Sequence, residues 1–153
     1  MSSSMNAYRA YSAATRTIAK TRQVVMLYDG AIRFIKQAQI FIGEKRIEER
    51  FRFLVRASDI MVGLQNSIDF ENGGEVAHTL HRFYSDMTVR ILAVNMHPRD
   101  GISLCDAILT DLTRMRDVWD DIDRGVIATE MTDDLPPPVP GNAAGPGNVT
   151  VSA

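Results

Sequence analysis

The sequence predicts an all-α protein, an antiparallel up-down four-helix bundle with a short N-terminal arm or helix and a disordered C-terminal tail. Three observations lead to this prediction. Four segments repeat apolar residues at helical spacing, short connections separate these segments, and none shows the two-residue alternation of a β-strand. A chain of 153 residues fits one domain with a single core. We divide it into an arm (1–19), a bundle (20–125) and a tail (126–153).

Each of the four segments carries one apolar stripe. The first stripe consists of Val24, Tyr28, Ala31, Ile35, Ala38 and Ile42. The second consists of Ile47, Leu54, Met61, Leu64 and Ile68. The third consists of Ala77, Leu80, Tyr84, Met87, Ile91 and Val94. The fourth consists of Cys105, Ile108, Leu112, Met115, Trp119 and Ile122. Steps of three and four residues keep a stripe on one helical face, so each segment is expected to bury that face. Four helices of about 20–23 residues, roughly 30 Å long, would form the bundle.

Helix-breaking residues mark the connections. Gly43 begins the first connection, and the paired Gly73 and Gly74 interrupt helical continuity in the second. In the third, Pro98 stops one helix and Asp100 is placed to cap the next. These connections fit an antiparallel bundle.

Composition excludes several other classes of protein. Cys105 is the only cysteine, so no internal disulfide framework can form. The longest uninterrupted apolar run, Val24 to Tyr28, is far below the roughly 20 residues of a membrane helix. No apolar stretch of a secretory signal follows Met1. From Thr132 on, proline and glycine are frequent, which predicts a disordered tail. We expect a cytoplasmic (cytosolic) protein without stable membrane insertion.

Charge is unevenly distributed, although the formal net charge is only -2. Residues 1–66 hold 11 Lys and Arg against 5 Asp and Glu, whereas residues 67–153 hold 6 against 14. Blocks of opposite sign can pair between helices, steer a charged partner or solvate two faces of the bundle. The sequence leaves these three alternatives open.

The first helix holds more apolar residues than one stripe requires. The additional ones are Val25, Met26, Leu27, Ile32, Phe34, Ile40 and Phe41. A helix that is apolar on two sides is either buried between neighbours or presents a groove to a partner. Complete burial is difficult in a bundle of four helices, so we favour a partner groove. Gly30 lies in phase inside this helix, where it permits close approach of another helix or another chain.

Residues that carry chemistry are sparse. Glu75, His78 and His81 share a helical face, but a di-iron bundle needs a second Glu-x-x-His motif, which the chain lacks. We therefore expect no metal. The chain has no phosphate-binding glycine loop and no nucleophile elbow, and we expect neither catalytic residues nor a cofactor. The protein is predicted not to be an enzyme.

A basic cluster raises the question of nucleic acid. It comprises Lys45, Arg46, Arg50, Arg52 and Arg56. Acidic residues interleave with it, whereas a phosphate-binding surface needs a clear excess of positive charge. We expect no nucleic acid as a partner. A non-enzymatic bundle that binds nucleic acid, or one that self-associates, is the alternative function.

Motifs in several segments occur together in a fixed order. Residues 26–35 read MLYDGAIRFI and residues 68–75 read IDFENGGE. Further motifs are Tyr84-Ser85-Asp86-Met87, Arg90-Ile91-Leu92, Asn95, Trp119 and the paired Tyr8 and Tyr11. Over about residues 8–122 this set resembles the flagellar secretion chaperone family (FliS). Two positions depart from that family, since no proline precedes the first long helix and Val89 stands where an arginine pair is common.

The resemblance implies a cytosolic export chaperone. Such a protein binds the disordered C-terminal segment of flagellin on apolar grooves, prevents premature polymerisation and delivers flagellin to the flagellar type III export apparatus. A membrane protein of the export gate (FlhA-like) is the second implied partner. The expected flagellin-binding residues are Tyr28, Phe34, Ile35, Phe41, Tyr84 and Met87. Tyr8 and Tyr11 are expected on a movable arm that covers part of the groove or contacts the export gate.

Overall fold

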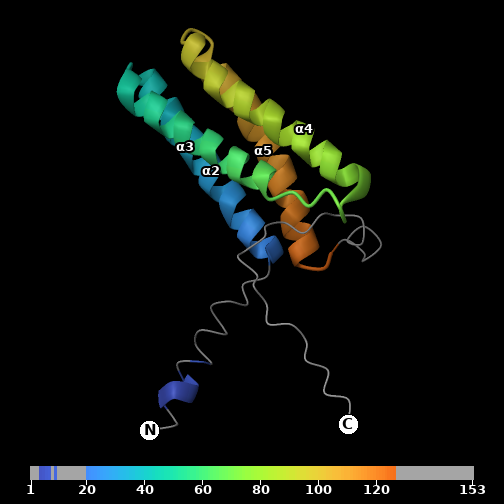
Figure 1. The fold of residues 1–153 in the computed structure, drawn as a ribbon. Coiled ribbons are helices and arrows are strands. Elements are labelled where there is room, and N and C mark those ends of the chain that lie inside the picture. Colours follow the sequence, from blue (N-terminus) through green and yellow to red (C-terminus); the bar gives the residue numbers. More distant parts are fainter. Residues whose placement is uncertain (1–3, 8, 10–19, 127–153) are drawn as a thin grey trace, which may run out of the picture.

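The computed structural model describes residues 4–7, 9 and 20–126. Four long helices run through the described part in alternating directions (Figure 1). They are α2 (Lys20–Gly43), α3 (Ile47–Asn66), α4 (Gly74–Ala93) and α5 (Gly101–Asp123), and a 3-10 turn, η1 (Val94–Met96), follows α4. The described ranges contain no β-strand, and the prediction of an all-α four-helix bundle is confirmed.

The ends of the chain fall largely outside this description. Of the predicted arm, residues 4–7 and 9 are helical and exposed. The predicted tail, 126–153, lies outside the described residues except for Val126. Among the helices that the structure describes, none combines the length and the apolar character needed to cross a membrane.

The predicted stripes form the core, with a few exceptions at the ends. All six residues of the third stripe are buried, as are five of the first and four of the fourth. Ile47 is the main exception, because 65% of its surface is exposed. It is the first residue of α3 and lies at the end of the bundle, where no further layer of side chains covers it. Leu54 is therefore the first buried residue of the second stripe, Met61 and Leu64 are buried after it, and Ile68 is partly buried.

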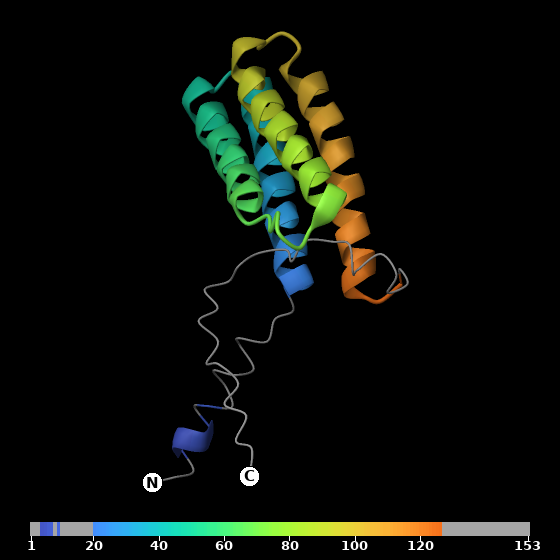
Figure 2. The ribbon, with the colours of Figure 1, turned by 45° about the vertical axis from the view of Figure 1, so that its right-hand side comes forward.

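The helices are joined along three seams and open along the fourth. Helix α2 packs closely on α3 and α5, and α4 packs on α3 but only sparsely on α5. Helices α2 and α4 are diagonal to each other (Figure 2). Gly30 is buried where α2 meets α3, and a Cβ there would lie 3.4 Å from Cδ1 of Ile60. The close approach that this glycine permits is thus made within the bundle.

The cap predicted for α5 is not formed as expected. Asp100 precedes α5, but its side chain makes no capping hydrogen bond. Its backbone angles, φ -102° and ψ 6°, differ from the extended conformation that lets an N-cap side chain reach the following amides. Instead, the hydroxyl of Ser103 donates to the carbonyl oxygen of Asp100 at 2.9 Å.

A buried tyrosine pair connects the two diagonal helices. The hydroxyl of Tyr28 on α2 donates to the hydroxyl of Tyr84 on α4 at 3.2 Å, and the ring centroids are 6.3 Å apart. Burial raises the pKa of Tyr84 to about 12 and holds the pKa of Tyr28 well above its usual value. Both hydroxyls are therefore neutral near pH 7, and the pair fixes the distance between α2 and α4 across the core.

Alkaline pH is expected to destabilise the bundle through this pair. A tyrosine ionises near pH 10 in the unfolded chain, whereas Tyr84 in the folded chain has a pKa of about 12. Because the pKa of Tyr84 is higher in the folded chain, the neutral hydroxyl contributes fully to the free energy of unfolding below the unfolded pKa. This contribution is lost as pH rises through the folded pKa. Urea unfolding at several pH values between the unfolded and the folded pKa should show the decrease in the free energy of unfolding. A variant carrying Tyr28→Phe and Tyr84→Phe should lose less, and equal losses in both proteins would contradict this explanation.

Candidate functional site

The six residues predicted to bind flagellin fall into two sets. The first set is Tyr28, Ile35, Tyr84 and Met87, and no more than 2% of each is exposed. These four side chains offer almost no surface to a partner in this conformation. The second set, Phe34 and Phe41, is partly buried on the outside of α2. Because α2 and α4 are diagonal, the structure does not bring both sets onto one surface. Tyr8 and Tyr11 lie outside the described residues.

Phe34 and Phe41 belong to an aromatic row along the seam between α2 and α3. The ring of Phe53 lies between them, 5.9 Å from Phe34 and 5.4 Å from Phe41. The guanidinium of Arg56 lies over Phe34 and Phe53, and that of Arg46 lies over Phe41 at 4.8 Å. Cations over ring faces stabilise this surface while keeping it amphipathic. We call these five residues the aromatic row.

The other additional apolar residues of α2 divide between core and surface. Val25 is fully buried, and Leu27 and Ile32 pack partly buried against the core. Met26 and Ile40 are 55% and 51% exposed. The additional apolar residues of α2 therefore contribute both to the core and to an exposed apolar surface. Each of the two interpretations, burial between helices and a surface open to a partner, holds for some of them.

A groove lies along the open seam between α4 and α5. Its volume is about 410 Å³, and its lining residues are Phe83, Asp86, Met87, Arg90, Asp111, Arg114, Met115 and Val118. The four apolar side chains supply its apolar surface, and charged side chains complete the lining. One guanidinium N–H of Arg90 donates to Oδ2 of Asp111 at 2.7 Å, an ion pair that links α4 to α5. We call this feature the α4/α5 groove.

Sequence reasoning identified only one residue of the α4/α5 groove, Met87. It missed Phe83, Met115 and Val118. A signal was available, because Phe83 and Val118 are apolar residues that stand directly beside the predicted stripes. What the pattern did not contain is the sparse packing of α4 on α5, which leaves these side chains accessible.

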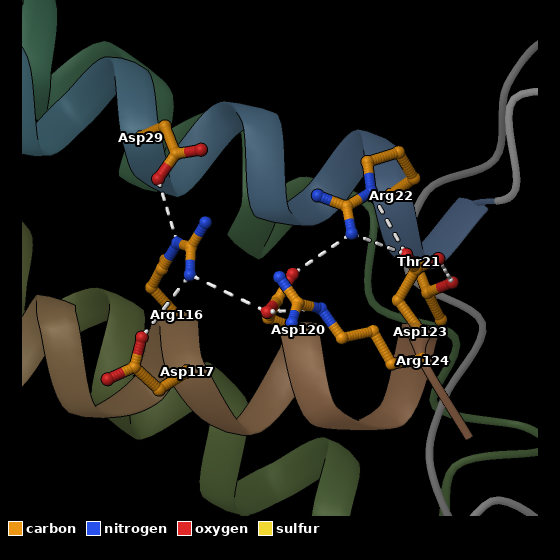
Figure 3. A network of polar contacts seen from close by, with 8 residues as sticks. All are labelled: Thr21, Arg22, Asp29, Arg116, Asp117, Asp120, Asp123 and Arg124. Carbon is orange, nitrogen blue, oxygen red and sulfur yellow. Dashed lines mark hydrogen bonds and ion pairs between the residues drawn. The ribbon is translucent and has the colours of Figure 1, made fainter. Parts of the chain in front are cut away.

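A network of ion pairs joins the start of α2 to the end of α5 (Figure 3). Its centre is Asp120, which is 6% exposed. Arg22 and Arg124 each place a nitrogen 2.9 Å from a carboxylate oxygen of Asp120, and Arg116 does so at 3.7 Å. Arg116 also contacts Asp29 on α2 at 2.8 Å. Three arginines thus surround one buried carboxylate.

Asp123 extends the network by one turn of α5. The hydroxyl of Thr21 donates to Oδ1 of Asp123 at 2.7 Å, and Arg22 contacts Oδ2 at 2.7 Å. The hydrogen bond from Thr21, followed by the contact with Arg22, lowers the pKa of Asp123. The contacts of Arg22 show that the basic first half and the acidic second half of the chain do pair between helices here.

The histidines on α4 have packing partners. The ring of Phe70 lies 5.3 Å from that of His78 and 5.6 Å from that of His81. Over the described part of the chain, no group of three or more His, Cys, Asp or Glu side chains is arranged to hold a metal ion. Cys105 is buried, and burial raises the pKa of its thiol to about 11, so the reactive thiolate is disfavoured.

This geometry defines a class of protein: a small antiparallel helical bundle with apolar surfaces on its outside. A family model described as "Flagellar protein FliS" matches residues 4–126. The chain belongs to the FliS family.

Named relatives agree with this assignment. The flagellar secretion chaperone FliS of Campylobacter jejuni is 40% identical over 80 residues, which cover 52% of this chain and 62% of that protein. This match spans less than two thirds of the Campylobacter protein. The flagellar secretion chaperone FliSB of Pseudomonas aeruginosa is 30% identical over 66% of this chain and 79% of its own length. FliS of Vibrio cholerae is 27% identical over 80% of this chain and 90% of its own length.

Proposed function

We propose that this protein is a cytosolic chaperone that binds the disordered C-terminal segment of flagellin, prevents its premature polymerisation and delivers it to the flagellar export apparatus. Membership of the FliS family supports the class, since its named relatives are flagellar secretion chaperones. The observation that carries the proposal is the α4/α5 groove, an apolar hollow on the outside of a helical bundle. Neither a cofactor nor a catalytic step enters the proposal.

The α4/α5 groove suits a helix formed on binding. Such a helix places apolar side chains at a spacing of three and four residues along one face, and a long groove between two helices receives that face. Met115 is only partly buried and has a flexible side chain, so it can repack around different client side chains, whereas Met87 supports the floor of the groove from the core. Arg114 lines the groove without an ion-pair partner in the part of the chain that the structure describes, and it can contact a carboxylate of the client.

The aromatic row provides a second contact surface in this proposal. Phe34 and Phe41 contact the client directly, whereas Tyr28, Ile35 and Tyr84 support both surfaces from the core. The row and the α4/α5 groove lie on opposite seams, so a client that reaches both must pass around the bundle. A disordered segment can do so, burying on the order of 1,000–3,000 Å² as it folds. Tyr8 and Tyr11, outside the described residues, remain the proposed contacts of the arm with the export gate.

Calorimetry with a peptide of the C-terminal flagellin segment from the same organism tests the proposal. We expect one peptide to bind per chain, with a clearly negative change in heat capacity because apolar surface is buried. The affinity should change little with salt, whereas binding to nucleic acid would weaken steeply. Failure of a folded, monomeric protein to bind the peptide would refute the proposal, and mass that rises with concentration would favour self-association.

Substitutions in the two surfaces should separate their contributions. Val118→Asp in the α4/α5 groove and Phe34→Asp in the aromatic row are each expected to weaken client binding by about 2–3 kcal/mol, because each places a charge in an apolar contact. Thr113→Asp is the matched control, since Thr113 is exposed on α5 and does not line the groove. Circular dichroism should show all three variants folded. Normal affinity of Val118→Asp would place the client elsewhere.

A further inference from the structure

A second pocket opens at the end of the bundle opposite the ion-pair network. Its volume is about 330 Å³, and its lining residues are Ile42, Lys45, Ile47, Arg50, Pro98 and Arg99. Ile42 lies at the end of α2, and Ile47 and Arg50 lie at the start of α3, with Lys45 in the connection between these helices. Pro98 and Arg99 belong to the connection that precedes α5. Three lining residues are apolar, three are cationic and none is acidic. We call this feature the basic end pocket.

The three cations of the basic end pocket lack carboxylate partners. Arg46, next to the pocket, contacts Glu44 and Glu49. In contrast, neither Lys45, Arg50 nor Arg99 forms an ion pair with any residue that the structure describes. Arg50 donates to the amide oxygen of Asn95 at 3.2 Å, which leaves its charge uncompensated. Three uncompensated cations around an apolar hollow favour an anionic occupant.

Two features of the backbone around the pocket also favour an anionic occupant. Lys45 has a φ of 58°, in the left-handed region that favours glycine. Lys45 therefore has a backbone conformation that is disfavoured for lysine, and its side chain lines the pocket. Helix α5 begins directly after Arg99 and Asp100, and no side chain caps its first amides. Its positive end adds to the field of the three cations.

We infer that the basic end pocket binds an acidic peptide segment of a partner protein. An apolar side chain of that segment would lie against Ile42, Ile47 and Pro98, and flanking carboxylates would face the three cations. This site is distinct from the α4/α5 groove and from the aromatic row, and it does not depend on the proposed client.

Two other occupants fit the pocket less well. The first alternative is the acidic part of the chain that follows α5, which holds Glu130, Asp133 and Asp134. This part continues from Val126, at the end of α5 opposite the pocket. Eight residues span at most about 29 Å, whereas α5 alone is roughly 33 Å long. Single-stranded nucleic acid is typically held by aromatic side chains on which bases stack, and none lines the pocket.

Fluorescence anisotropy with a labelled pentapeptide, Glu-Asp-Leu-Asp-Glu, tests the inference on the full chain. A peptide with Gln and Asn in place of the four acids should bind at least about tenfold more weakly, because it lacks the charges. A peptide with Ser in place of Leu should also bind about tenfold more weakly, since the apolar contact is lost. If the wild-type protein binds all three peptides equally, or none of them, the inference is overturned.

Variants then locate the site. Lys45→Gly should weaken binding about fivefold and should melt at or above the temperature of the wild type, because glycine suits the positive φ. Its loss of affinity therefore cannot result from unfolding. Arg99→Glu should weaken binding more strongly. Lys36→Glu, exposed on α2 outside the pocket, is the control and should bind normally.

Two further results would overturn the inference. One is equal affinity of Lys45→Gly, Arg99→Glu and the control. The other is an oligothymidylate that competes for the same residues more strongly than the acidic peptide does. Binding of the flagellin peptide should be unchanged in Lys45→Gly, so failure here and failure of the proposed function are distinguishable.

Discussion

Replacing Tyr28 with alanine is expected to lower the free energy of unfolding by about 4 kcal/mol, because it removes a large, fully buried side chain from the centre of the bundle. The change leaves a cavity between α2 and α4, and it deprives the buried hydroxyl of Tyr84 of the hydrogen bond that it accepts. Tyr28→Phe keeps the ring and loses only that bond, so we expect a cost of about 1–2 kcal/mol. Urea unfolding at neutral pH measures both values.

Tyr28→Phe also tests where a client can bind. Tyr28 has no accessible surface, so Tyr28→Phe should bind the flagellin peptide with the affinity of the wild type. Phe34→Ala, on the aromatic row, should weaken binding while changing stability less than Tyr28→Ala does. If Tyr28→Phe instead stayed stable and lost affinity, Tyr28 would contact the client in an opened form of the bundle.

The second large effect is expected at Asp120. Asp120→Asn should lower the free energy of unfolding by about 2 kcal/mol, because it removes the buried carboxylate that three guanidinium groups contact, and Arg124 has no other carboxylate partner among the described residues. The value is below that of a fully buried ion pair because Arg22 and Arg124 are partly exposed to water, which screens their charge.

Asp117→Asn is the matched control for Asp120→Asn. Asp117 lies one turn away on the same helix and contacts Arg116, but 61% of its side chain is exposed. We expect its replacement to change stability by less than about 0.5 kcal/mol. Thermal melting of the two variants side by side provides the comparison. Equal melting temperatures would mean that Asp120 contributes no more than a surface ion pair.

Much of the fold could be predicted from the sequence because helix formation and burial leave a periodic pattern. Every member of the stripe from Ala77 to Val94 is buried, since steps of three and four residues keep these side chains on one face. Gly73 and Pro98 fall in the observed connections for local reasons of backbone geometry. Asp100 shows the limit of such local reasoning, because its side chain could cap α5 only from a backbone conformation that it does not adopt.

The candidate site was less predictable because neighbouring apolar residues look alike in sequence. Phe34 and Ile35 are adjacent, yet one lies on the aromatic row and the other in the core. Which of them is accessible depends on the positions of α3 and α5, which periodicity does not specify. The α4/α5 groove exists because two helices that follow each other in the chain pack only sparsely. How closely two helices pack is a tertiary property, so the apolar character of Val118 beside its stripe could not show that this side chain lines a groove.

The ion-pair network also bears on how the bundle responds to mechanical force. The start of α2 and the end of α5 lie at the same end of the bundle (Figure 2). Tension between these two points would peel α5 from α2 one turn at a time, a geometry in which the bonds are loaded in succession. The contacts of Arg22 with Asp123 and Asp120 would carry that load first.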